Sequence, residues 1–437
     1  MKDKNKKISF ISLGCSKNQV DLEYLMGSIK DEGYEITHVP EDSDAIVINT
    51  CGFIEPAVAE AIENILEMSR RKQKDAKLIV TGCMSERYKL ELLKEMPEID
   101  YFTGVGELDK VIGFLNGTGE RPKNYGTSRL IANTPYFAYL KISEGCNNKC
   151  SYCAIPGIRG QLVSRPSEDI IAEAENLVAQ GVKEIIIISQ DNTKYGTDIY
   201  GRKEIVPLLK KIENIEGDFT VRIMYMNPDG VDDELIDTIC SSKKILSYFD
   251  IPVQHYSAKM LKAMKRRSTP EIIDEVFTAI RKKDPESFLR TTMIVGFPGE
   301  TESDFDELIA FLKKHRPDFA GFFPYYREKG TAAYTMGQPV GKREVNRRIK
   351  VLQKLQKENT NTRLKSLKKN DIICYVEGES EESEFILQGR ATFQAPEIDG
   401  KAFIIGGLAD RGYGPYRCRI KKIAYPDIYC EITDNTW

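Results

Sequence analysis

The residues with the clearest chemical potential are three cysteines near the middle of the chain. Cys146, Cys150 and Cys153 lie in EGCNNKCSYCAIPGIRG with the spacing C-x3-C-x2-C. Three thiolates on one loop can hold three irons of a [4Fe–4S] cluster, which leaves the fourth iron open to a small molecule. The alternative is a structural zinc site, but zinc needs a fourth ligand and usually paired C-x2-C motifs, and neither lies nearby. The spacing therefore favours an open iron–sulfur cluster.

Three further cysteines occupy equivalent positions in the first third of the chain. Cys15, Cys51 and Cys83 each follow a strand candidate directly, in SLGC, INTC and VTGC. The carboxyl ends of parallel strands share one edge of a sheet, so these thiols should meet there as a second three-thiolate site. One such cysteine would more often be buried filler, but three in the same position are hard to ascribe to coincidence. The four remaining cysteines show no ligand spacing and are expected to be packing residues: Cys240, Cys374, Cys418 and Cys430.

Length and composition fit a cytoplasmic protein of several domains. At about 150 residues per domain, 437 residues suggest about three domains. Lys and Arg number 63 against 66 Asp and Glu, a net charge of −3 that gives no global argument for nucleic-acid binding. The start, MKDKNKKISFISLGC, looks like a lipoprotein signal, but its apolar run is short and Ser12 replaces the usual Leu. No segment has the 18 or so apolar residues of a membrane span. In the cytoplasm thiols stay reduced, which favours metal binding over disulfides.

The elements that must position the cysteines alternate between strand and helix patterns. Residues 1–120 contain KISFISLG, AIVINT and KLIVTG between amphipathic stretches, which predicts a parallel α/β domain. Residues 121–133 have no periodicity and are interpreted as a linker. Residues 134–366 supply six strand candidates between helical patterns: YFAYLKI, EIIIIS, TVRIMYM, YFDIPVQ, LRTTMIVGF and AGFFPYY. These six repeats predict a partial (βα)6 barrel with its reactive groups at the C-terminal strand ends, and Thr301 is expected to cap one of its helices.

The end of the chain changes both charge and pattern. Residues 341–369 form a basic helical stretch with 11 Lys or Arg and two Glu, a net charge of +9. Residues 367–437 then show five short strands with Gly and Pro turns, which predicts a small antiparallel β-barrel of the oligonucleotide-binding type.

The central motif, with Tyr152 before its last cysteine, resembles the radical S-adenosylmethionine (SAM) superfamily. The resemblance implies that SAM chelates the open iron through its amino and carboxylate groups and is cleaved to a 5′-deoxyadenosyl radical. It also implies SAM contacts at the ends of the predicted strands: Tyr152, Ser189, Gln190, Asp191, Arg222, Gln254, His255, Gly296, Gly299 and Glu300. Two of these expectations have ordinary alternatives, since GFPG can be a plain turn and a lone His is more often a satisfied core group.

The order LGC, NTCGF, TGC, central cysteine loop and C-terminal barrel resembles the methylthiotransferase family along essentially the whole chain. That resemblance implies two [4Fe–4S] clusters with SAM, the auxiliary one on Cys15, Cys51 and Cys83, and a TRAM domain at 367–437. One SAM would methylate a sulfur species, and a second would give the radical that allows CH3–S transfer to an unactivated carbon. A low-potential electron donor such as flavodoxin or ferredoxin, and a sulfur source, are also implied.

The family acts mainly on a tRNA adenosine or on an aspartate β-carbon of ribosomal protein S-twelve. LGCSKNQVDLE and GRATFQAPEIDG resemble the second branch, whereas tRNA enzymes typically read YGCQMN at the first cysteine. Residues 368–437 carry nine Lys or Arg and twelve Asp or Glu, a charge of −3 that suits a basic protein better than tRNA. The basic 341–369 stretch argues the other way, unless Ile349, Leu352 and Leu355 pack it against the barrel. A non-catalytic, metal-stabilised RNA-binding module would explain the cysteines and the small barrel, but not the SAM-type loops.

Overall fold

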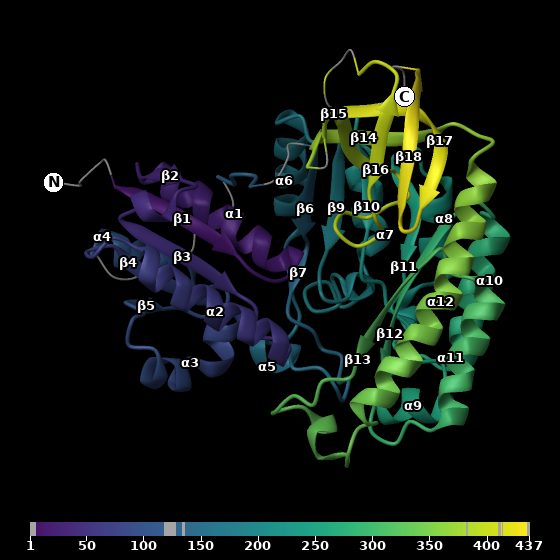
Figure 1. The fold of residues 1–437 in the computed structure, drawn as a ribbon, viewed down its shortest axis with the longest axis horizontal. Helices are drawn as coiled ribbons and strands as arrows, with labels where there is room; N and C mark the ends of the chain where they lie inside the picture. Colours follow the sequence, from purple (N-terminus) through teal and green to yellow (C-terminus); the bar gives the residue numbers. More distant parts are fainter. Residues whose placement is uncertain are drawn as a thin grey trace.

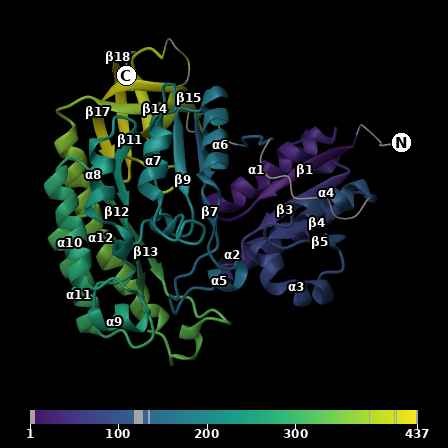
Figure 2. The same cartoon turned by 180° about the vertical axis from the view of Figure 1, so that it is seen from behind.

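The computed structural model describes residues 6–117, 128–132, 136–381, 383–409, 412 and 414–434. They form an N-terminal α/β unit, a larger central α/β unit and a small β-barrel that covers one end of the central unit (Figures 1 and 2). Residues 121–127 and 133 of the expected linker lie outside the described residues. Among the described residues, no helix is both long enough and apolar enough to cross a membrane.

The N-terminal unit is a five-stranded parallel sheet in the order β2-β1-β3-β4-β5. Its strands are β1 (Lys7–Ser12), β2 (Glu35–Thr37), β3 (Ala45–Thr50), β4 (Lys77–Gly82) and β5 (Tyr101–Phe102). Its helices are α1 (Ser16–Asp31), α2 (Glu55–Arg71), α3 (Cys83–Glu95) and α4 (Leu108–Asn116). β1, β3 and β4 are the three predicted strands, and they lie side by side at the centre of the sheet because each carries an apolar run long enough for burial.

The central unit contains a six-stranded parallel sheet in the order β13-β12-β11-β10-β9-β6, which confirms the predicted α/β fold of partial-barrel type. The strands are β6 (Phe137–Lys141), β9 (Glu184–Ile188), β10 (Thr220–Ile223), β11 (Ile245–Asp250), β12 (Phe288–Val295) and β13 (Phe319–Pro324), with a short β7 (Ser143–Glu144) and β8 (Val163–Ser164) paired apart. The helices are α5 (Ile155–Ile158), α6 (Ser167–Ala179), α7 (Ile205–Glu213), α8 (Asp233–Ser241), α9 (Ala258–Ala263), α10 (Pro270–Lys283) and α11 (Glu302–His315). Thr301 caps α11 in a capping box with Asp304, as predicted.

The C-terminal barrel is closed by five strands in the order β14-β15-β16-β18-β17. They are β14 (Ile372–Ser380), β15 (Ser383–Ala391), β16 (Ala402–Gly406), β17 (Gly414–Ala424) and β18 (Asp427–Asp434). The expectation of a wholly antiparallel barrel is wrong in one pair, because β16 and β18 run parallel. Cys374, Cys418 and Cys430 are fully buried in its core, as expected of packing residues.

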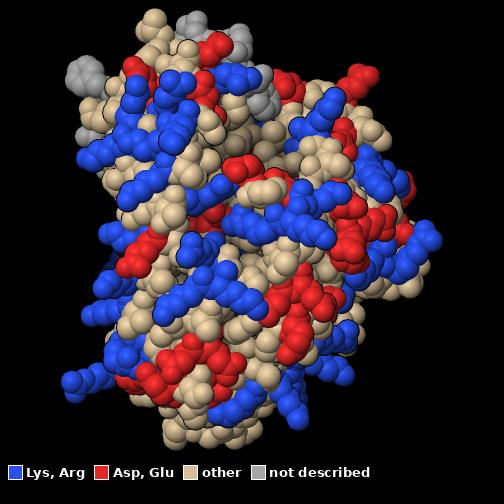
Figure 3. All heavy atoms as spheres, turned by 90° about the vertical axis from the view of Figure 1, so that its right-hand side faces the viewer, with Lys and Arg blue, Asp and Glu red and all other residues tan. Residues whose placement is uncertain are grey.

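The basic stretch forms the long helix α12 (Lys342–Leu367), which runs along α11 towards the barrel (Figure 1). Ile349, Leu352 and Leu355 pack on the central core and not on the barrel, so that expectation was wrong. Leu364 and Leu367, further along the same helix, join the core that contains the barrel residues. The face of the molecule seen in Figure 3 mixes blue Lys and Arg side chains with patches of red Asp and Glu. The charge of α12 is therefore partly balanced by acidic neighbours such as Glu302 and Glu286.

Candidate active site between two cysteine sets

The three central cysteines lie on the loop between β7 and α5 and line a cavity of about 280 Å³ at the C-terminal ends of the core strands. The backbone fixes this loop. Ser151 donates from its N–H to the Met264 carbonyl at 3.0 Å and from its hydroxyl to the Ala263 carbonyl at 2.8 Å. Cys146 accepts from the Asn148 N–H at 3.4 Å. These hydrogen bonds hold the loop, and with it the three cysteines, beside the cavity. None of them uses the thiol of Cys150 or Cys153.

The chemistry of these donors fits a metal cluster. Burial raises the pKa of the Cys153 thiol to about 12 and also raises that of Cys146. A thiol in such surroundings becomes a thiolate when a cation binds it, and iron supplies that cation. Among the described residues no three His, Cys, Asp or Glu side chains converge on a single metal ion. A [4Fe–4S] cluster presents separate irons to its ligands, so it does not require that convergence.

The N-terminal cysteines meet at one edge of their sheet. Cys15 directly precedes α1, Cys51 follows β3 and Cys83 begins α3, at the carboxyl ends of three neighbouring strands. Gly14 has φ +100°, and a Cβ there would lie 3.2 Å from the Cys51 sulfur. A Cβ on Gly52 would lie 2.6 Å from the Met84 Cα. Glycine therefore lets the three cysteine-bearing turns pack directly against one another.

Arg159 joins the two sets. Its Nε donates to the Cys83 sulfur at 3.3 Å, and its Nη1 donates to Glu144 of β7 at 2.9 Å. Burial raises the pKa of Cys83 to about 12, although the Arg159 guanidinium acts in the opposite direction. Cys83 also packs against Ala154 and Ile158, just after Cys153. The two cysteine sets therefore lie on facing walls of one seam.

Residues from both the N-terminal and the central unit line the central cavity. Lys17 and Phe53, each two positions after an N-terminal cysteine, face it together with the three central cysteines. Of the SAM contacts implied by the resemblance, Tyr152, Gln190 and Gln254 line the same cavity. Six of the predicted site residues therefore line one space directly, and Cys15 and Cys51 each have a near neighbour in its wall.

Ser189 and Asp191 lie just outside that space. Asp191 lines an adjoining hollow of about 260 Å³ with Cys146 and Asn148, and it accepts from the Asn148 side-chain amide at 2.8 Å. Ser189 is fully buried, and its hydroxyl accepts from the Asp191 N–H at 3.1 Å. Asp191 thus supports the cysteine loop, and Ser189 supports Asp191.

Arg222 does not belong to the cavity, contrary to expectation. Its Nε donates to Glu184 at 2.6 Å and its Nη2 to the Thr392 carbonyl of the C-terminal barrel at 2.7 Å. β10 ends at Ile223, so Arg222 lies inside the strand and points to the end of the sheet that the barrel covers. Its role here is to join the central unit to the barrel.

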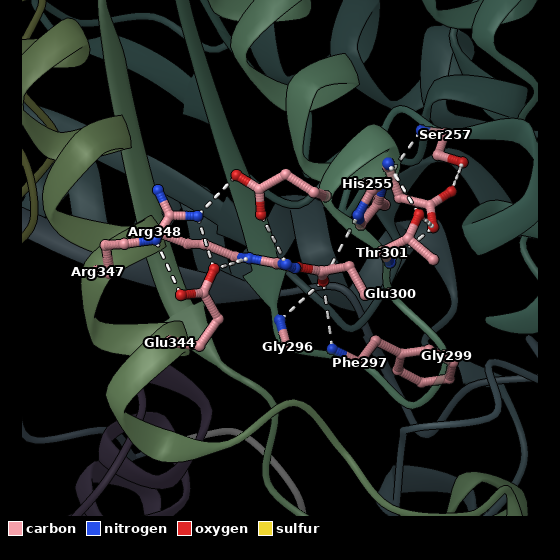
Figure 4. A network of polar contacts seen from close by, with 12 residues as sticks. His255, Ser257, Gly296, Phe297, Gly299, Glu300, Thr301, Glu344, Arg347 and Arg348 are labelled. Carbon is pink, nitrogen blue, oxygen red and sulfur yellow. Dashed lines mark hydrogen bonds and ion pairs between the residues drawn. The ribbon is translucent and has the colours of Figure 1, made fainter.

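His255 and Glu300 are also placed differently from expectation. Neither lines the cavity, and both are fully buried behind the loop that follows β12 (Figure 4). The His255 Nδ1 accepts from the Tyr256 and Ser257 N–H groups at 2.9 and 3.0 Å, and its Nε2 lies 3.6 Å from the Glu300 carboxylate. His255 is therefore a buried core residue. α11 begins at Glu302 after the Thr301 cap, so Glu300 lies in the loop before the helix.

Glu300 instead fixes the glycine-containing loop. It accepts from the Gly296 N–H at 2.7 Å and from Arg348 of α12 at 2.6 Å. Burial would raise the pKa of Glu300, but His255 and Arg348 outweigh it and lower that pKa. Gly296 and Gly299 have φ of +87° and +82°. The cavity does not reach either glycine, and a Cβ on Gly296 would lie 2.4 Å from a Val345 methyl of α12, so close packing requires this glycine.

Several cavity residues had not been predicted: Lys17, Phe53, Asn148, Tyr225, Asn227, Asp250, Arg266, Arg290 and Thr292. Asp250 ends β11 and could have been found by the strand-end rule that identified the cysteines. Tyr225 and Gln254 are non-glycine residues with φ of 54° and 68°, and both line the cavity. Strained backbone of this kind concentrates at functional sites.

Comparisons with known proteins identify the family to which the chain is similar. Residues 7–104 match the family model described as Uncharacterized protein family UPF0004, and residues 140–312 match the Radical SAM superfamily. A ribosomal protein uS12 methylthiotransferase RimO of Nitratiruptor is 42% identical over 92% of each chain. Its counterpart from Geobacter sulfurreducens is 42% identical over 99% of this chain and all of its own.

The fold comparison points the same way. The radical S-adenosylmethionine methyltransferase TsrM from Kitasatospora setae superimposes with a TM-score of 0.55 at 13% identity, over 75% of this chain and 74% of its own. At that identity the likeness concerns the fold alone. Because the RimO relatives match from end to end, the chain belongs to the radical SAM methylthiotransferase family of ribosomal protein uS12, RimO.

Proposed function

We propose that this enzyme transfers a methylthio group to the β-carbon of an aspartate in ribosomal protein uS12. The observation that carries the proposal is one cavity lined by the three central cysteines and by Lys17 and Phe53, which each follow an N-terminal cysteine by two positions. The chain is 42% identical to a uS12 methylthiotransferase over 99% of its length. Methylthiolation needs a radical source and a sulfur donor directed at the same carbon. One cavity between two thiolate sites meets that need.

We assign Cys146, Cys150 and Cys153 to the cluster that binds SAM, and Cys15, Cys51 and Cys83 to the auxiliary cluster. When bound, the two [4Fe–4S] clusters and SAM supply the electron transfer, the radical and the transferred sulfur group. The chain positions these groups. Tyr152, Gln190 and Gln254 line the space beside the central cysteines, and Arg266 lies 3.8 Å from the Cys150 sulfur through Nη1.

The walls of the cavity protect a reactive species from water. Phe53, Ile155 and Pro156 contribute apolar surface where the N-terminal unit meets the cysteine loop. Asp250, which also lines the cavity, is already hydrogen-bonded within the protein. It accepts from Arg290 at 3.0 Å and from the Tyr225 N–H at 2.8 Å. A lining whose polar groups are held in place favours transfer to a bound substrate over side reactions.

The proposed division of labour follows the three units. Residues 1–120 carry the auxiliary cluster, residues 134–366 form the radical SAM core with its basic helix, and residues 367–437 form the TRAM domain. We further propose that the electron comes from a low-potential donor such as flavodoxin or ferredoxin, that a separate source renews the sulfur, and that the enzyme works in the cytoplasm, where uS12 is made.

Mass spectrometry tests the function directly. Reconstituted, reduced enzyme with SAM is incubated in parallel with uS12 protein and with bulk tRNA. A methylthio mass gain on a uS12 aspartate is expected, and Cys51→Ala should not produce it. A gain on tRNA adenosine alone would overturn the assignment and favour the tRNA branch of the family.

A further inference from the structure

Lys17 is a buried lysine in the cavity between the two cysteine sets. It lies in the first turn of α1, two residues after Cys15, and only 5% of it is exposed. Its Nζ lies 3.3 Å from the centroid of the Tyr225 ring, so its side chain crosses from the N-terminal unit to the central unit. Both residues line the 280 Å³ cavity. The ammonium group therefore lies where a substrate would enter between the two sets.

Among the described residues, no carboxylate lies within ion-pair distance of this ammonium group. Within the part of the chain that the structure describes, Lys17 forms no ion pair and its Nζ donates no hydrogen bond; the contact with the Tyr225 ring is its one recorded partner. A buried ammonium without an opposite charge is costly, and one aromatic face compensates for only part of that cost.

The two arginines of the cavity already have protein partners. Arg290 binds Asp250 and Asp399 at 3.0 and 3.2 Å. Arg266 donates to the Pro252 carbonyl at 3.0 Å and lies beside the Cys150 sulfur. Among the residues described, Lys17 is thus the cavity cation that donates no hydrogen bond to the protein.

We propose that Lys17 binds the side-chain carboxylate of the substrate aspartate and so holds its β-carbon between the two cysteine sets. The inference rests on the proposed function, because it takes the substrate to be an aspartate. The β-carbon is directly bonded to the carboxylate carbon, so fixing the carboxylate confines the reacting C–H group to a small region. The Tyr225 ring covers one side of the ammonium group and leaves the cavity side for the ligand.

Lys17→Met tests this contact, because methionine keeps the length of the side chain and removes its charge. Lys30→Met is the matched control, since Lys30 lies in the last turn of the same helix and is exposed. Binding to uS12 is measured with reconstituted enzyme without reductant, using native uS12 and a uS12 variant with Asn in place of the modified aspartate. Iron content and SAM cleavage without uS12 are measured on the same preparations.

The expected result is a loss of uS12 affinity that depends on the charge of the substrate side chain. Lys17→Met should weaken binding of native uS12 roughly tenfold to a hundredfold, the range for a charge-assisted hydrogen bond. The Asn variant should bind Lys17→Met and Lys30→Met equally, and Lys17→Arg should recover part of the lost affinity. The iron content of Lys17→Met should stay near the wild-type level, and the Lys30→Met control should keep both iron content and SAM cleavage.

Three results would overturn the role of Lys17. Lys17→Met could lose the same affinity for native and Asn uS12, or lose affinity for neither. It could also bind SAM more weakly with intact uS12 binding, which would assign the lysine to the SAM carboxylate. If the wild-type enzyme itself fails to methylthiolate uS12, the proposed function falls, and this inference falls with it. The wild-type reaction thus separates the two failures.

Discussion

The seam between the N-terminal and central units contains a buried ion cluster whose disruption should be measurable. Arg129 donates to Glu23 of α1 at 2.9 Å and to Glu173 of α6 at 2.7 Å, and no more than 7% of any of the three side chains is exposed. Arg129→Met would leave two buried carboxylates short of a cation. Breaking such a pair costs about 3–5 kcal/mol, so the free energy of unfolding should fall by about that amount.

Urea unfolding of the reconstituted protein measures the loss. Arg71→Met is the matched control, because Arg71 also lies between two glutamates, Glu41 and Glu67, but its side chain is 45% exposed. Solvent screens such exposed pairs, so the control should unfold almost as the wild type does. Adding Glu23→Gln to Arg129→Met should restore part of the stability, since it removes one of the uncompensated charges.

The effect should also depend on pH. Burial would raise the pKa of Glu173, but Arg165 and Arg129 outweigh it and lower that pKa from 4.5. A lowered pKa stabilises the fold above the unfolded value, and that contribution is lost as the pH falls through the folded value. The difference in the free energy of unfolding between wild type and Arg129→Met should therefore be largest at neutral pH and become smaller below about pH 4.5. Equal stability of Arg129→Met and Arg71→Met, or further loss on adding Glu23→Gln, would refute the reasoning.

Other predictions concern the cysteine sets and one helix cap. Cys150→Ala should abolish reductive SAM cleavage, measured as 5′-deoxyadenosine, because two thiolates cannot hold the cluster with one iron open. Cys51→Ala should retain that cleavage and lose methylthio transfer to uS12; loss of both activities would contradict separate roles for the two sets. Thr301→Ala should lower the free energy of unfolding by about 1 kcal/mol, since Thr301 caps α11, and Thr301→Ser should recover most of it; equal losses in both variants would argue against the cap.

The sequence predicted the features that follow from local rules. Cys15, Cys51 and Cys83 were expected at one sheet edge because each directly follows an apolar run, and parallel strands align their carboxyl ends. The structure places them at the carboxyl ends of three neighbouring strands. The six strands of the central unit were recognisable for the same reason: segments such as Glu184–Ile188 are wholly buried and rich in β-branched residues.

The errors arose where a partner distant in sequence decides the orientation of a side chain. Arg222 donates to the Thr392 carbonyl of the C-terminal barrel, 170 positions later, and no local sequence pattern indicates that contact. Glu300 was expected at the cavity, but Arg348 of α12 draws its carboxylate to the opposite side. The lysine of the LGCSKN motif was missed because one lysine two residues after a cysteine looks like any surface residue until the other wall of the cavity is known.

Buried charged groups contribute to the relative placement of the two cysteine sets, beside the apolar contacts that join the two units. Arg159 approaches Cys83 and Asn18 on one side, and Asp21 and Glu144 on the other, while Lys141 pairs with the same two carboxylates. Apolar surfaces can slide past one another at little cost, whereas such pairs are satisfied in one register only. A reaction that directs a radical and a sulfur donor at the same carbon tolerates little displacement between its two sites. We therefore interpret the charged seam as the part of the fold that fixes the distance between the two sets, with Arg129 adding to it through Glu23 in the middle of α1.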